Sequence, residues 1–257
     1  MKHLNQKVMA KQVGLVLLEG SIGELCFYKS QGVYRVRRKG GISGKKIKSD
    51  PRFELTRQNM AEFATAVKAA YLLKNVVRSI MRCNDKGASR RLTSCMSKVI
   101  KADVVNKRGE RTVKWGRPEL LQGFEFNQDT SLANAFFVGI NASIDRETGK
   151  IKVDLPEFSP ATTIEAPQGA THFRLHAGAA AIDFEKGTYD LAKSKSDLIS
   201  IGDQVVRPLQ FALSTTPASS DPLFVVFGIE FVTIVNREEL PLGGARGNAM
   251  VILRVEE

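Results

Sequence analysis

The chain has 257 residues, of which 43% are hydrophobic, and it carries a formal net charge of +11. This hydrophobic share excludes an intrinsically disordered protein and is enough for one large domain or two modest ones. Three cysteines without a C-x-x-C pair argue against a disulfide framework and favour a reducing compartment. The apolar run Val13–Leu18 is too short for a signal peptide or for the roughly 20 residues of a membrane span. We therefore expect a soluble cytoplasmic protein.

The charge is divided unequally along the chain. Residues 1–118 hold 27 Lys and Arg against 8 Asp and Glu, whereas residues 119–257 hold 11 against 19. The first part therefore carries +19 and the second part −8. A basic part joined to an acidic part predicts an anionic partner for the first, or head-to-tail contact between copies of the chain.

The N-terminal residues predict strands and a basic loop. Gln12–Leu18 is apolar and β-prone, which is typical of a strand. The runs Glu24–Lys29 and Val33–Arg38 flank the short loop Ser30–Gly32, and this pattern predicts a β-hairpin. Alternation along the second run places arginine on both faces of the hairpin. The segment Lys39–Lys48, with three glycines and four lysines, predicts a loop.

A long helix and a shorter one are predicted next. The capping signal Ser49–Pro51 precedes a stretch, up to about Arg82, that contains neither Gly nor further Pro. The apolar face shifts along this stretch, so the helix either contacts two different partners or breaks near Leu72. Ala88–Val105 predicts a second, antiparallel helix. The polar, basic segment Asn106–Pro118 predicts a linker.

Residues 119–257 are rich in β-prone stretches separated by turns that contain Pro or Gly, including DRETGK at 145–150. The predicted strands are Phe136–Ile144, Ile151–Leu155, His172–Phe184, Gln204–Leu213, Leu223–Val235 and Ala249–Val255. We therefore predict an α+β protein. Residues 1–118 would form a basic β-hairpin with an antiparallel helical pair, and residues 119–257 an acidic, all-β antiparallel sandwich or partly closed barrel.

The basic hairpin and the loop after it are the predicted binding site. Their cationic side chains are opposed locally only by Asp50 and would neutralise phosphates without reading bases, while tyrosines would stack on unpaired bases. The same cluster would also dock on an acidic protein surface; simple solvation is the remaining alternative. The predicted binding residues are Tyr28, Lys29, Tyr34, Arg35, Arg37, Arg38, Lys39, Lys45, Lys46, Lys48 and Arg52.

Two glycine motifs in this loop fit known phosphate sites poorly. The P-loop pattern G-x-x-x-x-G-K-[ST] requires Gly at Lys39 and Ser or Thr at Lys46. The G-x-x-G clamp of KH domains joins two helices, whereas Gly41–Gly44 follows a predicted hairpin. Neither motif predicts a nucleotide site.

Catalytic and metal-binding patterns are sparse. His172 and His176 share one strand face, but Arg174 between them would repel a cation, so a half-buried polar face is the favoured interpretation. Cys83 and Cys95 fall in helical segments and are typical of small core residues. We predict no catalytic residue, no metal and no cofactor.

Several short motifs are shared with other proteins. Gly20–Gly23, the aromatic hairpin that ends in Arg35 and Arg37, the motifs DPRF, TRQN and EF within Asp50–Phe63, and GATHF at Gly169–Phe173 resemble uncharacterised bacterial proteins of unknown function. The match covers residues 20 to 63, and the resemblance implies no activity and no site residues.

The favoured hypothesis is a non-enzymatic assembly or interaction protein whose basic hairpin engages an acidic protein surface, including that of another copy. An alternative is sequence-independent nucleic-acid binding by the same residues. An enzymatic function would require a pocket that brings His172 or His176 near a carboxylate.

Overall fold

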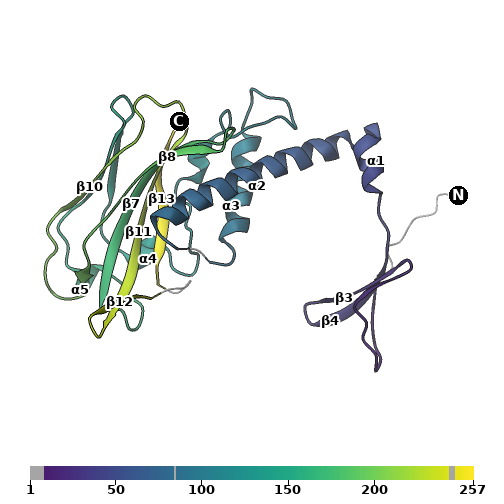
Figure 1. Cartoon of the computed structure of the whole chain (residues 1–257), viewed down its shortest axis with the longest axis horizontal. Coiled ribbons are helices and arrows are strands. Elements are labelled where there is room, and N and C mark those ends of the chain that lie inside the picture. The colour runs from purple at the N-terminus through teal and green to yellow at the C-terminus, as the bar shows by residue number, and fades with distance from the viewer. Residues whose placement is uncertain (1–8, 84, 243–246) are drawn as a thin grey trace. The chain divides into compact units, whose positions relative to one another are not determined.

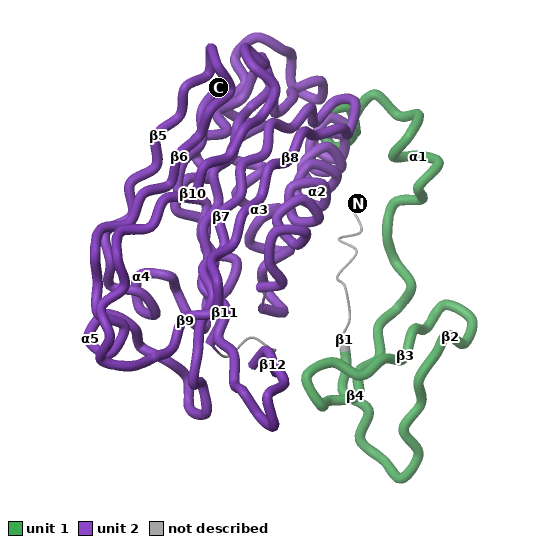
Figure 2. Tube along the Cα trace, turned by 60° about the vertical axis from the view of Figure 1, so that its left-hand side comes forward, with its two compact units in different colours: residues 1–57 green, residues 58–257 purple. Residues whose placement is uncertain are grey.

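A computed structural model describes residues 9–83, 85–242 and 247–257 of the chain (Figure 1). The chain forms two compact units, residues 1–57 and residues 58–257 (Figure 2). Helices together with antiparallel sheets confirm the predicted α+β class.

The first unit contains a four-stranded antiparallel sheet in the order β1-β4-β3-β2. Its strands are β1 (Met9–Lys11), β2 (Gly20–Ile22), β3 (Leu25–Ser30) and β4 (Val33–Arg38). β3 and β4 pair as a hairpin around Gln31 and Gly32, whose φ angles of 51° and 78° suit a tight turn. The predicted strand at Gln12–Leu18 is wrong, because residues 13–18 form a loop between the two edge strands β1 and β2.

The basic loop predicted at residues 39–48 is partly helical. Helix α1 (Gly44–Ser49) begins after Ser43, whose side chain accepts a hydrogen bond from Lys46 N and so caps the helix. This short helix was missed because glycine and lysines gave no apolar periodicity. The predicted capping signal at Asp50 is present, since Asp50 accepts from Arg52 N at the start of the 3₁₀ helix η1 (Pro51–Phe53).

Two antiparallel helices lie side by side in the second unit. Helix α2 (Glu54–Ile80) runs without the break that was considered near Leu72, and α3 (Ala88–Lys101) returns along it. Lys74 Nζ donates to Ser89 Oγ near one end of the pair, while Phe63 and Lys101 line one groove near the other. Within the described residues, no helix is both long and apolar enough to span a membrane.

Two antiparallel sheets complete this unit. The larger has the order β12-β11-β7-β8, with β13 also paired to β11 and β9 to β7, and the smaller has the order β10-β6-β5. The strands are β5 (Asn141–Asp145), β6 (Lys150–Leu155), β7 (His172–Asp183), β8 (Thr188–Lys195), β9 (Ile199–Ser200), β10 (Leu209–Ser214), β11 (Leu223–Val235), β12 (Glu238–Pro241) and β13 (Ala249–Glu256). Three short helices are η2 (Pro118–Leu121), α4 (Leu132–Ala135) and α5 (Pro160–Thr163).

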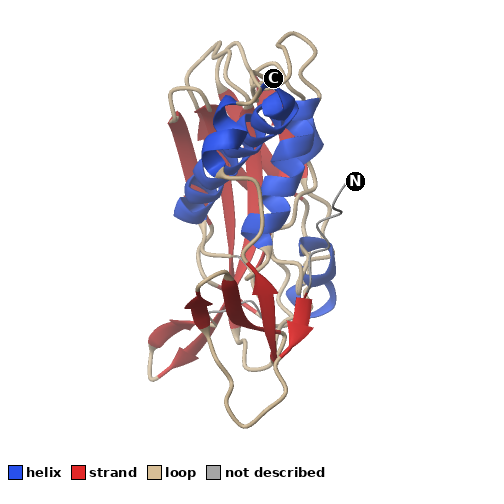
Figure 3. Cartoon of the chain, turned by 90° about the vertical axis from the view of Figure 1, so that its right-hand side faces the viewer, coloured by secondary structure: helices blue, strands red, loops and turns tan. Residues whose placement is uncertain are grey.

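The long central strands bury both of their faces. On β11, Phe224 and Val226 pack in one cluster with α2 and α3, whereas Val225 and Phe227 pack in a second cluster with the smaller sheet. Seen from the helical side, α2 and α3 lie in front of the strands (Figure 3). The second unit is therefore built as helices, large sheet and small sheet.

The division between units falls at Arg57 and Gln58, whereas the sequence predicted it at Pro118 and Glu119. The two helices share a core with the large sheet, so they belong with the strands. The segment predicted as a linker packs on α2, where Gly109 N donates to Glu62 Oε1 at 2.9 Å. The net charge changes from positive to negative near Pro118, which lies inside the second unit.

The predicted strands differ from the observed ones mostly at their ends. β5 and β10 begin five residues later than predicted, at Asn141 and Leu209. β8 and β12 were not predicted, because both are exposed edge strands with charged residues and little apolar alternation. The turn predicted at 145–150 is present, and β5 pairs with β6 across it.

Candidate interaction surface

The N-terminal sheet has one largely apolar face. Cross-strand partners lie on the same side of a sheet, and here Phe27 faces Val36 while Ile22 faces Leu25. Ala10 of the edge strand β1 also pairs with Val36 and extends this face. We call these side chains, with Tyr34, the apolar face of the N-terminal sheet.

The opposite face is basic. Tyr28 pairs with Arg35, Arg35 in turn pairs with Lys11 of β1, and Cys26 pairs with Arg37. The guanidinium of Arg37 lies over the ring of Tyr28, 5.5 Å from its centre, which is a cation–π contact. This basic face therefore presents two arginines and a lysine around one aromatic ring.

Within the described part of its own unit, neither face of the sheet is covered by a second layer. None of the described residues from 10 to 57 is buried, and both hydrophobic clusters of the protein lie in the second unit. A small sheet with an apolar face normally needs a second layer to bury it before it becomes stable in water. The N-terminal sheet thus has apolar side chains like those of a layer that faces a core, but these side chains are exposed or half-buried.

The structure brings only some of the predicted binding residues together. Tyr28, Arg35 and Arg37 share the basic face, whereas Lys29, Tyr34 and Arg38 lie on the apolar side of the same strands. Lys29 lies over the Tyr34 ring, 5.0 Å from its centre, and Arg38 forms an ion pair with Glu24. The remaining predicted residues lie outside the sheet: Lys39 follows β4, Lys45, Lys46 and Lys48 are on α1, and Arg52 is in η1.

Arg52 is already engaged within its own segment. Its Nη2 atom lies 2.7 Å from Asp50 Oδ2, and hydrogen bonds from the Arg52 side chain and backbone hold the pKa of Asp50 below its usual value. Arg57 anchors the same turn, since its Nη1 atom donates to the carbonyls of Ile47 and Asp50, both at 2.9 Å. These contacts position α1, whose three lysines are exposed.

An apolar loop next to the sheet was missed as a surface feature. The amide of Gln12 accepts a hydrogen bond from Leu18 N at 2.9 Å and donates to Leu18 O at 3.2 Å, which closes the base of loop 13–18. Val13, Leu15 and Val16 are strongly exposed in this loop. The run was visible in the sequence, but a run of this length is equally typical of a strand.

The two histidines lie on the polar end of β7. His176 is buried, and its Nε2 atom lies 3.1 Å from Glu230 Oε2. This hydrogen bond outweighs the burial of Glu230 and lowers the pKa of that carboxyl. Arg174 forms an ion pair with Glu239 at 3.1 Å, so the polar side chains Arg174 and His176 each have an acidic partner. Across the described residues, no group of three His, Cys, Asp or Glu side chains is arranged to hold a metal.

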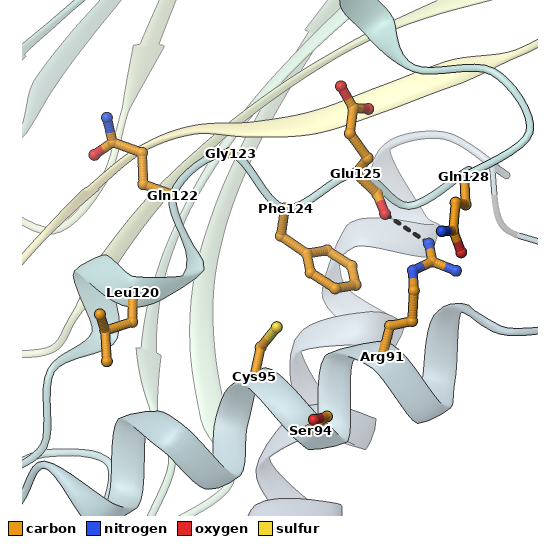
Figure 4. Close-up of a pocket in the computed structure, with 9 residues that line it drawn as sticks. All are labelled: Arg91, Ser94, Cys95, Leu120, Gln122, Gly123, Phe124, Glu125 and Gln128. Atoms are coloured by element: carbon orange, nitrogen blue, oxygen red, sulfur yellow. Dashed lines mark hydrogen bonds between the residues drawn. The ribbon is translucent and has the colours of Figure 1, made fainter.

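A hollow of about 500 Å³ lies between α3 and the chain after η2 (Figure 4). Arg91 reaches over it, with Nη2 2.8 Å from the carbonyl of Glu125 and Nη1 2.6 Å from Asp85 Oδ2. In Figure 4 the carboxylate of Glu125 points away from Arg91 and from the Phe124 ring. The hollow therefore presents an arginine that is already paired, a phenyl ring and the half-buried thiol of Cys95.

Comparison of the sequence with known proteins found no matching family model and no curated protein with significant similarity.

Proposed function

We propose that this protein is a non-enzymatic assembly protein whose N-terminal sheet docks on an acidic protein surface, with a second copy of the chain as the partner. The proposal rests on one observation: residues 10–57 contain a sheet with an apolar face but no buried residue. A layer of this kind gains stability when another surface covers it. Docking would supply the layer that the unit lacks.

The charge of the unit determines which surface fits. Residues 1–57 carry 13 Lys and Arg against 4 Asp and Glu, and Arg35 and Arg37 stand on one face. A basic surface is attracted to an acidic one, and the attraction weakens as salt screens it. The part after Pro118, which we propose to be a β-sandwich, carries the opposite charge.

The acidic counterpart that we propose is the β11–β12 hairpin of a second copy. Val235 and Glu238 are cross-strand partners there, and Leu240 lies on the same face; all three are exposed. β12 is also an edge strand of the large sheet. This hairpin therefore combines acidic and apolar side chains, as the N-terminal sheet combines basic and apolar ones. A contact between two different surfaces leads to a ring or a filament.

Light-scattering mass of nuclease-treated protein tests the proposal at about 0.05 M and about 0.5 M salt. We expect a multiple of the chain mass at low salt and a smaller particle at high salt. The double variant Arg35→Glu, Arg37→Glu should stay monomeric at both. The matched control Arg82→Glu, Lys86→Glu makes the same charge change at exposed residues of the second unit and should assemble as the native protein does.

A charge swap identifies the partner surface. Glu238→Lys should weaken assembly, and combining this change with Arg35→Glu and Arg37→Glu in one chain should restore at least part of it. A native protein that is monomeric at low salt and high concentration would refute self-assembly. If the native protein assembles but the combined variant does not, the basic face contacts an acidic surface other than the β11–β12 hairpin.

Sequence-independent nucleic-acid binding is the second candidate. The observation in its favour is that Tyr28 lies with Arg35 and Arg37 on one face, where a ring and two cations suit a base and its phosphates. Anisotropy of a labelled single strand of about 20 nucleotides would show affinity that falls steeply with salt. Unchanged affinity in the Arg35→Glu, Arg37→Glu variant would exclude this face as the binding site.

We also propose a cytoplasmic location. Cys26, Cys83 and Cys95 are free thiols, which is typical of proteins in a reducing compartment. The expected measurement is three reactive thiols per chain after denaturation of protein isolated under non-reducing conditions.

A further inference from the structure

The helical layer of the second unit carries a second cationic surface, separate from the N-terminal sheet. Residues 58–118 contain 14 Lys and Arg, of which 11 are exposed, and only 4 Asp and Glu. Three of these acids are buried: Glu62 accepts from Gly109 N, Asp85 pairs with Arg91, and Asp103 accepts from Thr112 N. Glu110 is the exposed acid among the described residues of this stretch. The solvent-facing side of the layer is therefore almost purely positive.

A groove of about 620 Å³ runs between α2 and α3 within this layer. Its α2 wall is apolar: Phe63 and Val67 line it, and Met60 and Tyr71 continue the stripe at the spacing of one helical face. Phe63 is 60% exposed and Tyr71 is 69% exposed. The stripe from Met60 to Tyr71 is about 16 Å long at 1.5 Å per residue, which is about three helical turns.

The α3 wall has a different chemistry. Arg90, Ser94, Ser97 and Lys101 recur at intervals of three or four residues and line the groove with Lys98. One wall is thus a row of cations and hydroxyls, and the other is a row of exposed apolar side chains. A ligand for this groove needs an apolar side and an acidic side along the same length.

We propose that the groove between α2 and α3 binds an acidic amphipathic helix of a partner protein. The apolar side of such a helix would cover the Met60–Tyr71 stripe, and its carboxylates would face Arg90, Lys98 and Lys101. The same groove of a second copy is unsuitable, because it would bring exposed cations against exposed cations. Phe63 and Tyr71 are rings on which bases can stack, but Met60 and Val67 of the same stripe are aliphatic, and the apolar side of a helix covers all four side chains whereas stacked bases use only the rings. This inference does not depend on the N-terminal sheet or on self-assembly.

A designed peptide tests this inference on the full-length protein. The probe has about 18 residues, with leucine along one helical face, glutamate along its flanks and alanine elsewhere. A control peptide has the same composition with leucine distributed around the helix, and a second control replaces glutamate with lysine. Binding is followed by anisotropy of the labelled peptide and by competition with a single strand of about 20 nucleotides.

We expect the patterned peptide to bind at least about tenfold more tightly than either control. Phe63→Ser with Tyr71→Ser should weaken binding at least about tenfold, and Lys98→Glu with Lys101→Glu should do so equally and reduce the salt dependence. Arg82→Glu with Lys86→Glu, exposed cations that do not line the groove, should change binding less than about threefold. All substituted side chains are exposed, so circular dichroism should remain native.

Two results would overturn the proposal. Equal affinity for the patterned and the redistributed peptide would show that charge alone is recognised. Tighter binding of the single strand, with displacement of the peptide and the same sensitivity to the Lys98 and Lys101 changes, would assign the groove to nucleic acid. The Arg35→Glu, Arg37→Glu variant should lose self-assembly but bind the peptide as the native protein does. Each proposal can therefore fail without the other.

Discussion

Gly178 of β7 lies against Ile80, the last residue of α2. A Cβ atom on Gly178 would lie 2.3 Å from Ile80 Cδ1 and 2.8 Å from Ile80 Cγ1. On the adjacent strand, a Cβ atom on Gly228 would lie 2.9 Å from Met81 Cε. Two glycines on the helix-facing side of the sheet therefore allow the end of α2 to approach the strands closely.

The first prediction concerns this contact. Gly178→Ala should lower the free energy of unfolding by about 1–3 kcal/mol, because an added methyl group has no space in a packed core. Ile80→Ala alone should cost about 2–5 kcal/mol through the cavity it leaves. In the double variant the new methyl group enters that cavity, so the loss should be smaller than the sum of the two. Urea unfolding followed by circular dichroism measures all three; strictly additive losses would contradict the close contact.

Much of the secondary structure was predictable because local signals agree with the fold. The α2 segment lacks glycine and proline, and β7 and β11 are long β-prone runs bounded by turn residues. The position of the helices on the large sheet was not predictable, since periodicity shows which residues are apolar but not what they contact. Charge even suggested a boundary at Pro118, where the fold has none.

The candidate surface was predictable in its residues but not in its geometry. Alternation along β4 correctly predicted arginine on both sides of the hairpin. Which side is apolar depends also on Ala10 and Ile22, which belong to three-residue strands that are too short to detect in sequence. The groove between α2 and α3 was missed because Phe63 and Tyr71 have the spacing of core residues, and only the fold shows that they are exposed.

The second prediction concerns Glu125. Burial raises the pKa of this carboxyl to about 7, against one hydrogen bond from Leu132 N that favours the charged form. The folded protein therefore binds a proton that the unfolded chain releases near pH 4.3. Stability from this group is present below about pH 4.3 and is lost as the pH rises through about 7.

Glu125→Gln should remove that loss, because glutamine keeps an acceptor for Leu132 N and carries no charge. We expect the variant to be about 1–2 kcal/mol more stable than the native protein at about pH 8.5, allowing for solvent screening of a half-buried group. At about pH 4.5 the two should be nearly equal. Urea midpoints at the two pH values measure the difference; an equal gain at both would exclude ionisation as its cause.

The third prediction concerns Asp103, which organises the loop that follows α3. Burial opposes its ionisation, but hydrogen bonds from Asn106, Thr112 and Val105 outweigh it and lower its pKa. Its contribution to stability is therefore present above the unfolded pKa of about 3.9 and lost as the pH falls through the lower folded value.

Asp103→Asn should lower the free energy of unfolding by about 1–3 kcal/mol at neutral pH, because Asn has one acceptor oxygen where the carboxylate has two. Hydrogen exchange of the amides at Val105, Asn106 and Thr112 should accelerate in the variant, while amides in β7 stay protected. The difference in stability should begin to shrink below about pH 3.9, where the carboxylate of the unfolded chain takes up a proton, and should vanish as the pH falls through the lower pKa of the folded protein. A difference independent of pH would show that the charge of Asp103 is unimportant.

The last prediction separates the two compact units. Both hydrophobic clusters lie between Ala66 and Val255, so a chain that starts at Glu54 should keep a melting temperature within about 4 °C of the native one. The fragment 1–57 contains no buried residue in its described part and should lack a cooperative melting transition when isolated. If docking covers the N-terminal sheet, the shortened chain should also stay monomeric at low salt. A fragment 1–57 that melts cooperatively as a monomer would show that the sheet is stable without a partner, and the reason for proposing assembly would then be lost.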